Sequence, residues 1–218
     1  MRKLIIIGAG NVGKFIAYNI NNFTKKFEVV GFLDDDIAKQ NSLIAGFKVL
    51  GGLDLLDDYS ANEYAVVFGI AFPKVKKELL GKYKNINFQY PNLISKKAWV
   101  SNQVKLGKGC IIYPGVCINY ESVIEDFVVI NMNCSIGHNT KIESFSSLAP
   151  GANLGGGTHL KEGVNLGIGV STVQNIIVGK YAVIGGQTML IENAPNETTV
   201  VGVPGKIKKS TNKEDFMH

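Results

Sequence analysis

Two short segments of this sequence hold residue types that could do chemistry. The first, residues 8–13, reads Gly-Ala-Gly-Asn-Val-Gly and spaces its glycines as G-x-G-x-x-G. Glycine lets the backbone turn tightly and approach a phosphate, and the free N–H groups at the start of a following helix attract anions. The second segment surrounds His138. An imidazole has an ordinary pKa of ~6.5, which suits a general base near neutral pH. The sequence therefore predicts an anion-binding segment and a proton-transfer residue.

The glycine segment lies between a predicted strand and a predicted helix. Residues 4–7 form a short apolar run of strand type, and apolar residues at helical spacing follow the last glycine. In this arrangement Gly8 and Gly10 permit the turn, and Gly13 lets the helix pack on the sheet. The alternative is that these glycines serve only that packing.

Three further elements complete this N-terminal region. Strands are predicted at 27–33 and 64–70, and a helix at 73–83. Asp34 follows the second strand, 21 residues beyond Gly13, which is close to the spacing of an acid that binds a ribose. The order of elements predicts one half of a Rossmann-like sheet. Because a dinucleotide fold needs two such halves, we expect a mononucleotide group rather than NAD.

The second half of the chain has an aliphatic residue at every sixth position, with Thr172 as the one exception. The residue two positions earlier is small or β-branched, and glycine or asparagine often follows, where a left-handed backbone is best tolerated. This period predicts a parallel β-helix with three strands per coil. We interpret Thr172 as tolerated packing, with its hydroxyl bonded to a nearby carbonyl. The predicted core positions are Ile94, Val100, Leu106, Ile112, Ile118, Ile124, Ile130, Ile136, Ile142, Leu148, Leu154, Leu160, Leu166, Thr172, Val178, Ile184 and Leu190.

Composition narrows the setting and the partners. We expect two domains, residues 1–92 and 93–218. The net charge is +5, but Arg2 is the only arginine, so the bidentate contacts typical of nucleic-acid recognition are scarce. No stretch approaches the ~18 apolar residues of a membrane span, and three cysteines without a CxxC pair suit a reducing compartment. We expect a cytoplasmic protein that binds neither nucleic acid nor membrane.

Taken together, these features resemble the bacterial hexapeptide-repeat sugar acyltransferases, in particular the sialic acid O-acetyltransferase and nucleotide-amino-sugar N-acetyltransferase family. The resemblance rests on GAG-x-x-GK at 8–14, LDDD at 33–36, the hexads and VVGVPGKI at 200–207. It implies a small Rossmann-like domain followed by a left-handed parallel β-helix, assembled as a homotrimer. It also implies acetyl-CoA along the groove between neighbouring helices and a nucleotide sugar on the N-terminal domain.

The resemblance makes His138 the catalytic base, with its side chain outside the prism two residues after core Ile136. The family commonly has an acidic residue directly after this histidine, and here it is Asn139. Glu143 is our candidate for the missing carboxylate, with a plain turn residue as the alternative. Nine residues after the histidine, where many members carry a second histidine near the thioester, stands Ser147. We expect His159 to be a solvated side chain.

The remaining site predictions concern substrate and cofactor contacts, and no metal is expected. Gly155 and Gly156 are candidate oxyanion donors. The expected nucleotide-sugar contacts are Gly8, Gly10, Asn11, Gly13, Asp34, Asp35, Gly69 and Asn131. The expected acetyl-CoA contacts are Ser147, Gly155, Gly156, Gly186, Gly202, Pro204 and Lys206.

The resemblance leads to one preferred reaction and several alternatives. We expect direct acetyl transfer from acetyl-CoA to the amino group of a UDP- or dTDP-linked amino-deoxy sugar, for surface glycan synthesis. O-acetylation of a sialic-acid-like sugar is the nearest rival, since the same machinery serves it. A nucleotide-sugar-binding protein with weak catalysis is the alternative from another class.

Overall fold

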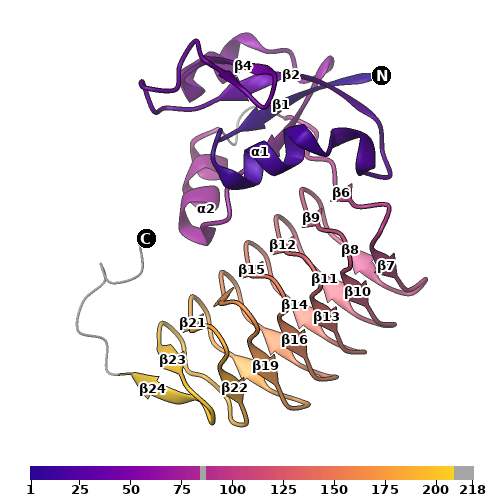
Figure 1. The fold of residues 1–218 in the computed structure, drawn as a ribbon, viewed down its shortest axis with the longest axis vertical. Coiled ribbons are helices and arrows are strands. Elements are labelled where there is room, and N and C mark those ends of the chain that lie inside the picture. Colours follow the sequence, from indigo (N-terminus) through magenta and orange to yellow (C-terminus); the bar gives the residue numbers. More distant parts are fainter. Residues whose placement is uncertain (84–86, 209–218) are drawn as a thin grey trace.

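The computed structural model describes residues 1–83 and 87–208, and in it an α/β domain sits on one end of a three-faced β-helix (Figure 1). The α/β domain holds a five-stranded sheet in the order β3-β4-β2-β1-β5. Strands β4, β2, β1 and β5 are parallel, and β3 is antiparallel to β4. Its elements are β1 (Arg2–Ile7), α1 (Asn11–Tyr18), η1 (Ile20–Asn22), β2 (Phe27–Leu33), β3 (Leu43–Ile44), β4 (Phe47–Gly51), η2 (Leu53–Asp58), β5 (Tyr64–Phe68) and α2 (Pro73–Lys82).

The predicted fold class is confirmed, and three faces of two-residue strands form the β-helix. The first face contains β6 (Leu93–Ile94), β9 (Ile111–Ile112), β12 (Val129–Ile130), β15 (Ser147–Leu148), β18 (Asn165–Leu166) and β21 (Val183–Ile184). The second contains β7 (Trp99–Val100), β10 (Cys117–Ile118), β13 (Ser135–Ile136), β16 (Asn153–Leu154), β19 (Ser171–Thr172) and β22 (Met189–Leu190). The third contains β8 (Lys105–Leu106), β11 (Val123–Ile124), β14 (Lys141–Ile142), β17 (His159–Leu160) and β20 (Ile177–Val178).

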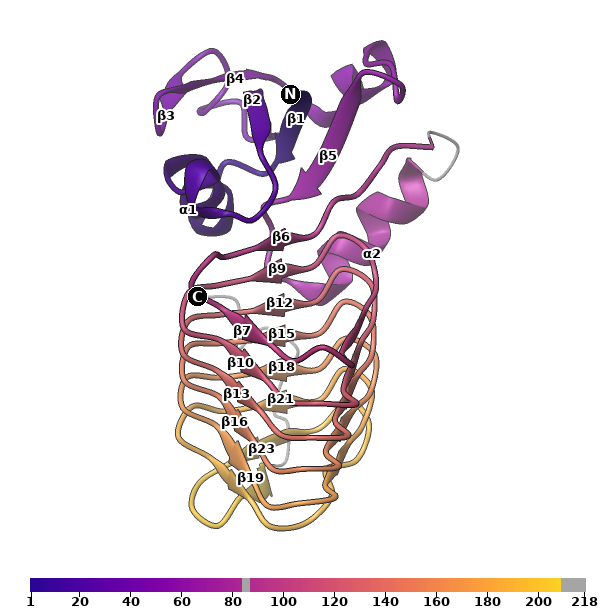
Figure 2. The same cartoon turned by 90° about the vertical axis from the view of Figure 1, so that its right-hand side faces the viewer.

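One coil of the β-helix is 18 residues long, because each strand pairs in parallel with the strand 18 positions away, as Ile118 does with Ile136 (Figure 2). The predicted core residue is the second residue of every short strand from β6 to β22. Parallel coils stack ~4.8 Å apart. Residues 18 positions apart in the turns are therefore direct neighbours.

Thr172, the exception in the aliphatic series, is buried at the core position of β19. Its hydroxyl oxygen accepts a hydrogen bond from the amide of Gly155 at 3.0 Å and lies 2.9 Å from the hydroxyl of Thr158. The polar side chain is tolerated because its hydroxyl is satisfied, as a buried polar group must be. Its partners are an amide and a hydroxyl rather than the expected carbonyl.

Both helices of the α/β domain contact the β-helix. Phe15 of α1 stacks on Tyr113, with ring centroids 3.9 Å apart. Lys76 of α2 is 1% exposed and donates a hydrogen bond to the carbonyl oxygen of Phe127 at 2.7 Å. Lys77 forms an ion pair with Glu162 at 2.7 Å. The contacts of Lys76 and Lys77 hold α2 along the turns that lead into the first face (Figure 2).

The far end of the first face is closed by a hairpin. β23 (Thr199–Val201) pairs in parallel with β21, and β24 (Lys206–Lys208) pairs antiparallel with β23. An uncovered last coil would expose unpaired strand edges, so a closing element of this kind is required.

Candidate functional site

A cavity of about 540 Å³ lies at the carboxyl ends of β1 and β2, where the glycine segment begins α1. Parallel sheets bind ligands at this edge, and the start of α1 directs backbone N–H groups toward it. Six of the eight expected nucleotide-sugar contacts line the cavity, namely Gly8, Gly10, Asn11, Asp34, Asp35 and Gly69.

Three glycine backbones, those of Gly8, Gly13 and Gly69, meet at the base of this cavity. A Cβ added at Gly13 would lie 2.0 Å from the carbonyl oxygen of Gly8, and one added at Gly69 would lie 2.6 Å from the Cα of Gly13. Gly8 also has a φ of +91°, in the left-handed region that favours glycine. Gly13 is buried and packs the helix on the sheet, so its place is beneath the cavity rather than in its wall.

The Asp34 carboxylate organises the wall of the cavity. It accepts hydrogen bonds from the amides of Ala9 at 2.7 Å and Asp36 at 2.9 Å, and the Lys39 ammonium lies 3.4 Å away. Burial alone would raise the pKa of Asp34, but these donors together hold that pKa below its ordinary value. Asp35 accepts the amide of Leu53 at 2.8 Å. Both carboxylates therefore fix loops around the cavity.

This cavity at the glycine segment, the N-terminal cavity, continues toward the first face of the β-helix. Phe72 and Val75 line both this cavity and a second one of about 410 Å³. Asn165 and Val183, on β18 and β21, line the second cavity as well. A ligand bound at the glycine segment can thus extend along α2 to the first face.

His138 lies in the turn between β13 and β14, at the corner where the second and third faces meet. Its ring is between two neighbours one coil away. Tyr120 stacks on it with centroids 5.4 Å apart and an angle of 10° between the rings. On the other side a Cβ added at Gly156 would lie 2.6 Å from Nε2. The ring therefore occupies space that Gly156 leaves free.

A chain of side chains connects His138 to a carboxylate. Nδ1 of His138 lies 2.8 Å from Oδ1 of Asn139, and Nδ2 of Asn139 donates to Oε2 of Glu121 at 2.7 Å. Glu121 is the residue one coil before Asn139. Neighbours along the chain do not indicate this contact, because it spans the 18-residue period of the coil. That spacing also identifies Tyr120, one coil before His138.

The two candidate oxyanion donors differ. The amide of Gly155 is already bonded to Thr172, so the expectation for Gly155 is wrong in this structure. Within residues 1–83 and 87–208, the amide of Gly156 donates to no backbone or side-chain acceptor. Gly156 is therefore the donor that remains beside His138.

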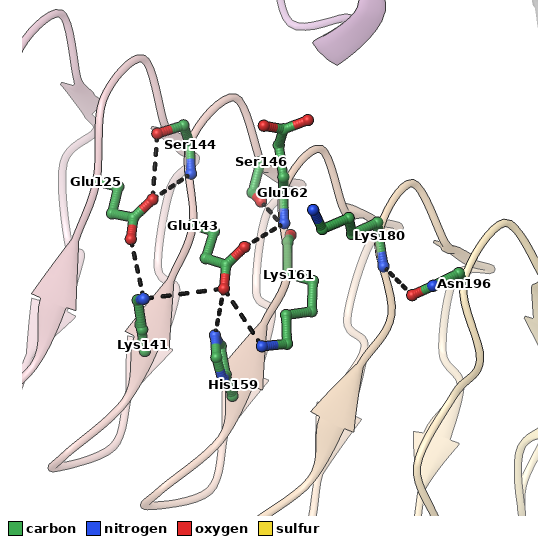
Figure 3. A network of polar contacts seen from close by, with 10 residues as sticks. All are labelled: Glu125, Lys141, Glu143, Ser144, Ser146, His159, Lys161, Glu162, Lys180 and Asn196. Atoms are coloured by element: carbon green, nitrogen blue, oxygen red, sulfur yellow. Dashed lines mark hydrogen bonds and ion pairs between the residues drawn. The ribbon is translucent and has the colours of Figure 1, made fainter.

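Glu143 is not the carboxylate partner of His138, which corrects the prediction. Its Oε1 lies 2.7 Å from Nε2 of His159, 3.4 Å from Nζ of Lys161 and 3.8 Å from Nζ of Lys141 (Figure 3). The two histidines lie in different parts of the coil, because His159 is on the third face and His138 is at the corner. His159 is thus hydrogen-bonded to Glu143 rather than freely solvated.

Other predicted contacts lie away from His138 within the chain. Asn131, in the turn between the first and second faces, accepts the amide of Met132 at 2.8 Å. Ser147 is buried on β15 of the first face. Gly186 follows β21. Gly202 and Pro204 lie in the exposed loop between β23 and β24, and exposed Lys206 is the first residue of β24.

Two features of the N-terminal cavity could not be predicted from the sequence. Lys39, which pairs with Asp34 and Asp36, places a cation in the wall, and exposed Phe72 places an aromatic ring there. Neither stands in a recognisable motif. Both come from loops whose path is set by the fold around them.

These features define a class of protein: a hexapeptide-repeat β-helix that carries a Rossmann-like domain with a nucleotide-sized cavity and a corner histidine. Residues 3–83 match the family of the PglD N-terminal domain. This match and the similarity to solved sugar acetyltransferase structures confirm the predicted resemblance to hexapeptide-repeat sugar acyltransferases.

Solved structures resemble the whole chain. The acetyltransferase domain of PglB from Neisseria gonorrhoeae FA1090 is 27% identical with a TM-score of 0.88, covering 95% of this chain and 100% of that one. The same domain has been solved with acetyl coenzyme A. PerB from Caulobacter crescentus, solved with CoA and GDP-perosamine, is 26% identical with a TM-score of 0.87, covering 95% and 98%.

A curated relative matches over a shorter stretch. Serine acetyltransferase from Haemophilus influenzae is 29% identical over 124 residues, which is 53% of this chain and 45% of that protein. The chain spans about half the length of such relatives. In the described residues no group of three or more His, Cys, Asp or Glu side chains is placed to hold a metal, and no helix is long and apolar enough to cross a bilayer.

Proposed function

We propose that this chain is an acetyl-CoA-dependent N-acetyltransferase that acts on a nucleotide-linked amino-deoxy sugar. The observation that carries the proposal is the environment of His138. Its Nδ1 lies 2.8 Å from Oδ1 of Asn139, and its Nε2 edge lies against Gly156, which has no side chain and whose amide donates to no acceptor among the described residues. A base and an oxyanion donor side by side are what acyl transfer requires.

The reaction uses these groups in order. Nε2 of His138 accepts a proton from the sugar amine as its nitrogen forms a bond to the thioester carbonyl carbon. The amide of Gly156 donates to the oxygen that becomes negative in the tetrahedral intermediate. The carbon–sulfur bond then breaks, and the proton on His138 passes to the departing sulfur. The products are an N-acetyl sugar and free CoA, and His138 returns to its starting state.

The N-terminal cavity supplies the binding site for the nucleotide in this proposal. The amides at the start of α1 and the Lys39 ammonium suit phosphate oxygens, and the exposed Phe72 ring suits stacking on a base. We expected UDP or dTDP, and the GDP-perosamine bound to PerB makes GDP a third nucleotide to test.

A second copy of the chain completes the site in this proposal. The turn that holds His138 joins the second and third faces, so it lies at the corner opposite the first face. The N-terminal cavity extends to the first face. One protomer cannot bring its own cavity and its own histidine together, whereas neighbours in a closed trimer can. We also propose cytoplasmic surface-glycan synthesis as the setting.

The test is turnover with acetyl-CoA and a panel of UDP-, dTDP- and GDP-linked amino sugars. Release of free CoA thiol, with an acetyl group on the sugar that survives mild alkali, identifies an amide product. An alkali-labile acetyl group identifies O-acetylation instead. Tight nucleotide-sugar binding without thiol release across the panel would show a binding protein and contradict the proposal.

A further inference from the structure

We infer that Glu121 is a positioning residue for His138, acting through Asn139; this rests on the proposed function. The two residues occupy the same turn position in consecutive coils, with φ of 57° and 55°. Stacking of the coils therefore brings their side chains together, and Asn139 donates to Glu121 at 2.7 Å. The carboxylate that the turn of His138 lacks is thus supplied from the turn one coil before.

The carboxylate decides which way the Asn139 amide points. An ionised carboxylate only accepts hydrogen bonds, whereas an amide has a donor end and an acceptor end. Glu121 must therefore face the NH₂ group of Asn139, which turns Oδ1 of Asn139 toward the imidazole. A neutral residue in place of Glu121 would leave the amide free to point either way.

The orientation of the amide in turn decides the tautomer of His138. Because Oδ1 of Asn139 can only accept, Nδ1 of His138 carries the hydrogen across their 2.8 Å contact. Nε2 is then unprotonated, and it is the nitrogen that lies against Gly156. With the amide reversed, Nε2 would carry the hydrogen and could not accept a proton from the acceptor.

Two further contacts hold the ring against rotation while the relay sets its protons. Tyr120 stacks on one face, at 5.4 Å between centroids, and the backbone of Gly156 lies against the Nε2 edge. Neither group distinguishes one tautomer from the other. The role of Glu121 therefore determines which ring nitrogen of His138 carries the hydrogen, and packing alone would not determine this.

The experiment is ¹⁵N NMR of the histidine side chains in the ligand-free protein, in alkaline buffer in which an imidazole is neutral. We expect Nδ1–H with a bare Nε2 in the unaltered protein. Glu121→Gln should shift the population toward Nε2–H and lower kcat by roughly tenfold or more, with little change in KM. Glu125→Gln is the matched control, because that carboxylate serves Ser144 and Lys141 and should change neither readout.

A rescue variant separates positioning from folding. In the double variant Glu121→Gln with Asn139→Asp, the glutamine donates to the aspartate, and the aspartate accepts from Nδ1 as the amide did. The tautomer and kcat should both return. An unchanged tautomer in Glu121→Gln would overturn the inference, as would a lost tautomer that the double variant does not restore. A tautomer that responds as described in a protein without acetyl transfer would refute the proposed function and leave the relay standing.

Discussion

The N-terminal cavity and the corner that holds His138 differ in shape and in what each contributes within one chain. The cavity is concave, and its wall is fixed by hydrogen bonds such as the one from Ala9 to Asp34 at 2.7 Å. The corner carries a partly exposed imidazole that is connected through Asn139 to the Glu121 carboxylate. In the proposed function, each chain therefore holds two halves of a site on opposite sides of a prism, and a second copy of the chain would supply the opposing half.

The corner should control turnover, and His138→Ala tests this most strongly. Loss of the base is expected to lower turnover by ~10²–10⁴ with CoA affinity nearly unchanged. His159→Ala is the matched control, because that imidazole lies on the third face and is hydrogen-bonded to Glu143 rather than to Asn139. Near-normal turnover of His138→Ala would show that His138 is not the base for acetyl transfer.

Gly156→Ala tests whether turnover depends on the position of the His138 imidazole as well as on its presence. The added methyl would come within 2.6 Å of Nε2, so the imidazole must move aside. A displacement of this kind should lower turnover by roughly ten- to a hundredfold. Gly81→Ala in α2 is the control, because an added Cβ there meets open space. Equal turnover of the two variants would contradict the account of the corner.

The cavity should control substrate binding rather than turnover. Asp34→Asn replaces an oxygen that accepts from Ala9 and Lys39 with a group that cannot accept from both, and charged hydrogen bonds are worth ~1.5–3 kcal/mol each. We expect KM for the nucleotide sugar to rise about tenfold with kcat little changed. Asp57→Asn, on the exposed side of η2, should leave both constants unaltered. A fall in kcat alone would assign Asp34 to chemistry instead.

Lys76 fixes the domain that holds the cavity onto the β-helix, and its effect should appear in stability. Burial lowers its pKa from 10.5 to about 7, so between these pH values the unfolded chain binds the proton that the folded chain has released. The stability contribution of Lys76 should therefore rise with pH across that window. The free energy of unfolding, measured by urea titration from pH 6 to 10, should rise more for the unaltered protein than for Lys76→Met. Parallel curves would contradict this, and Lys82→Met on the exposed side is the control.

The fold could be predicted from the sequence because its cause is local and repeated. One aliphatic side chain per strand enters the core, so the period of six is visible directly, and even Thr172 fell on the expected position. The short strands β3 and β4 carried no such period and were missed.

The glycine turn and His138 could be predicted from the sequence, whereas the residues that contact His138 could not. The glycine turn and His138 have recognisable motifs, whereas the partner of His138 was assigned to Glu143, five residues along the chain. In a stacked coil the relevant distance is 18 residues, which selects Glu121 and Tyr120. Which carboxylate reaches which side chain depends on turn geometry, and periodicity alone does not report it.

Mixing two inactive variants tests the division of the site most directly. His138→Ala chains and Gly13→Ala chains, the latter with a methyl 2.0 Å from the Gly8 carbonyl in the cavity floor, are unfolded and refolded together at equal amounts. If each site takes its cavity from one chain and its histidine from a neighbour, about a quarter of the sites in randomly mixed trimers are intact. Acetyl transfer near a quarter of the unaltered level is the expected result. Mixed assemblies, verified by mass, that stay as inactive as the separate variants would contradict the account.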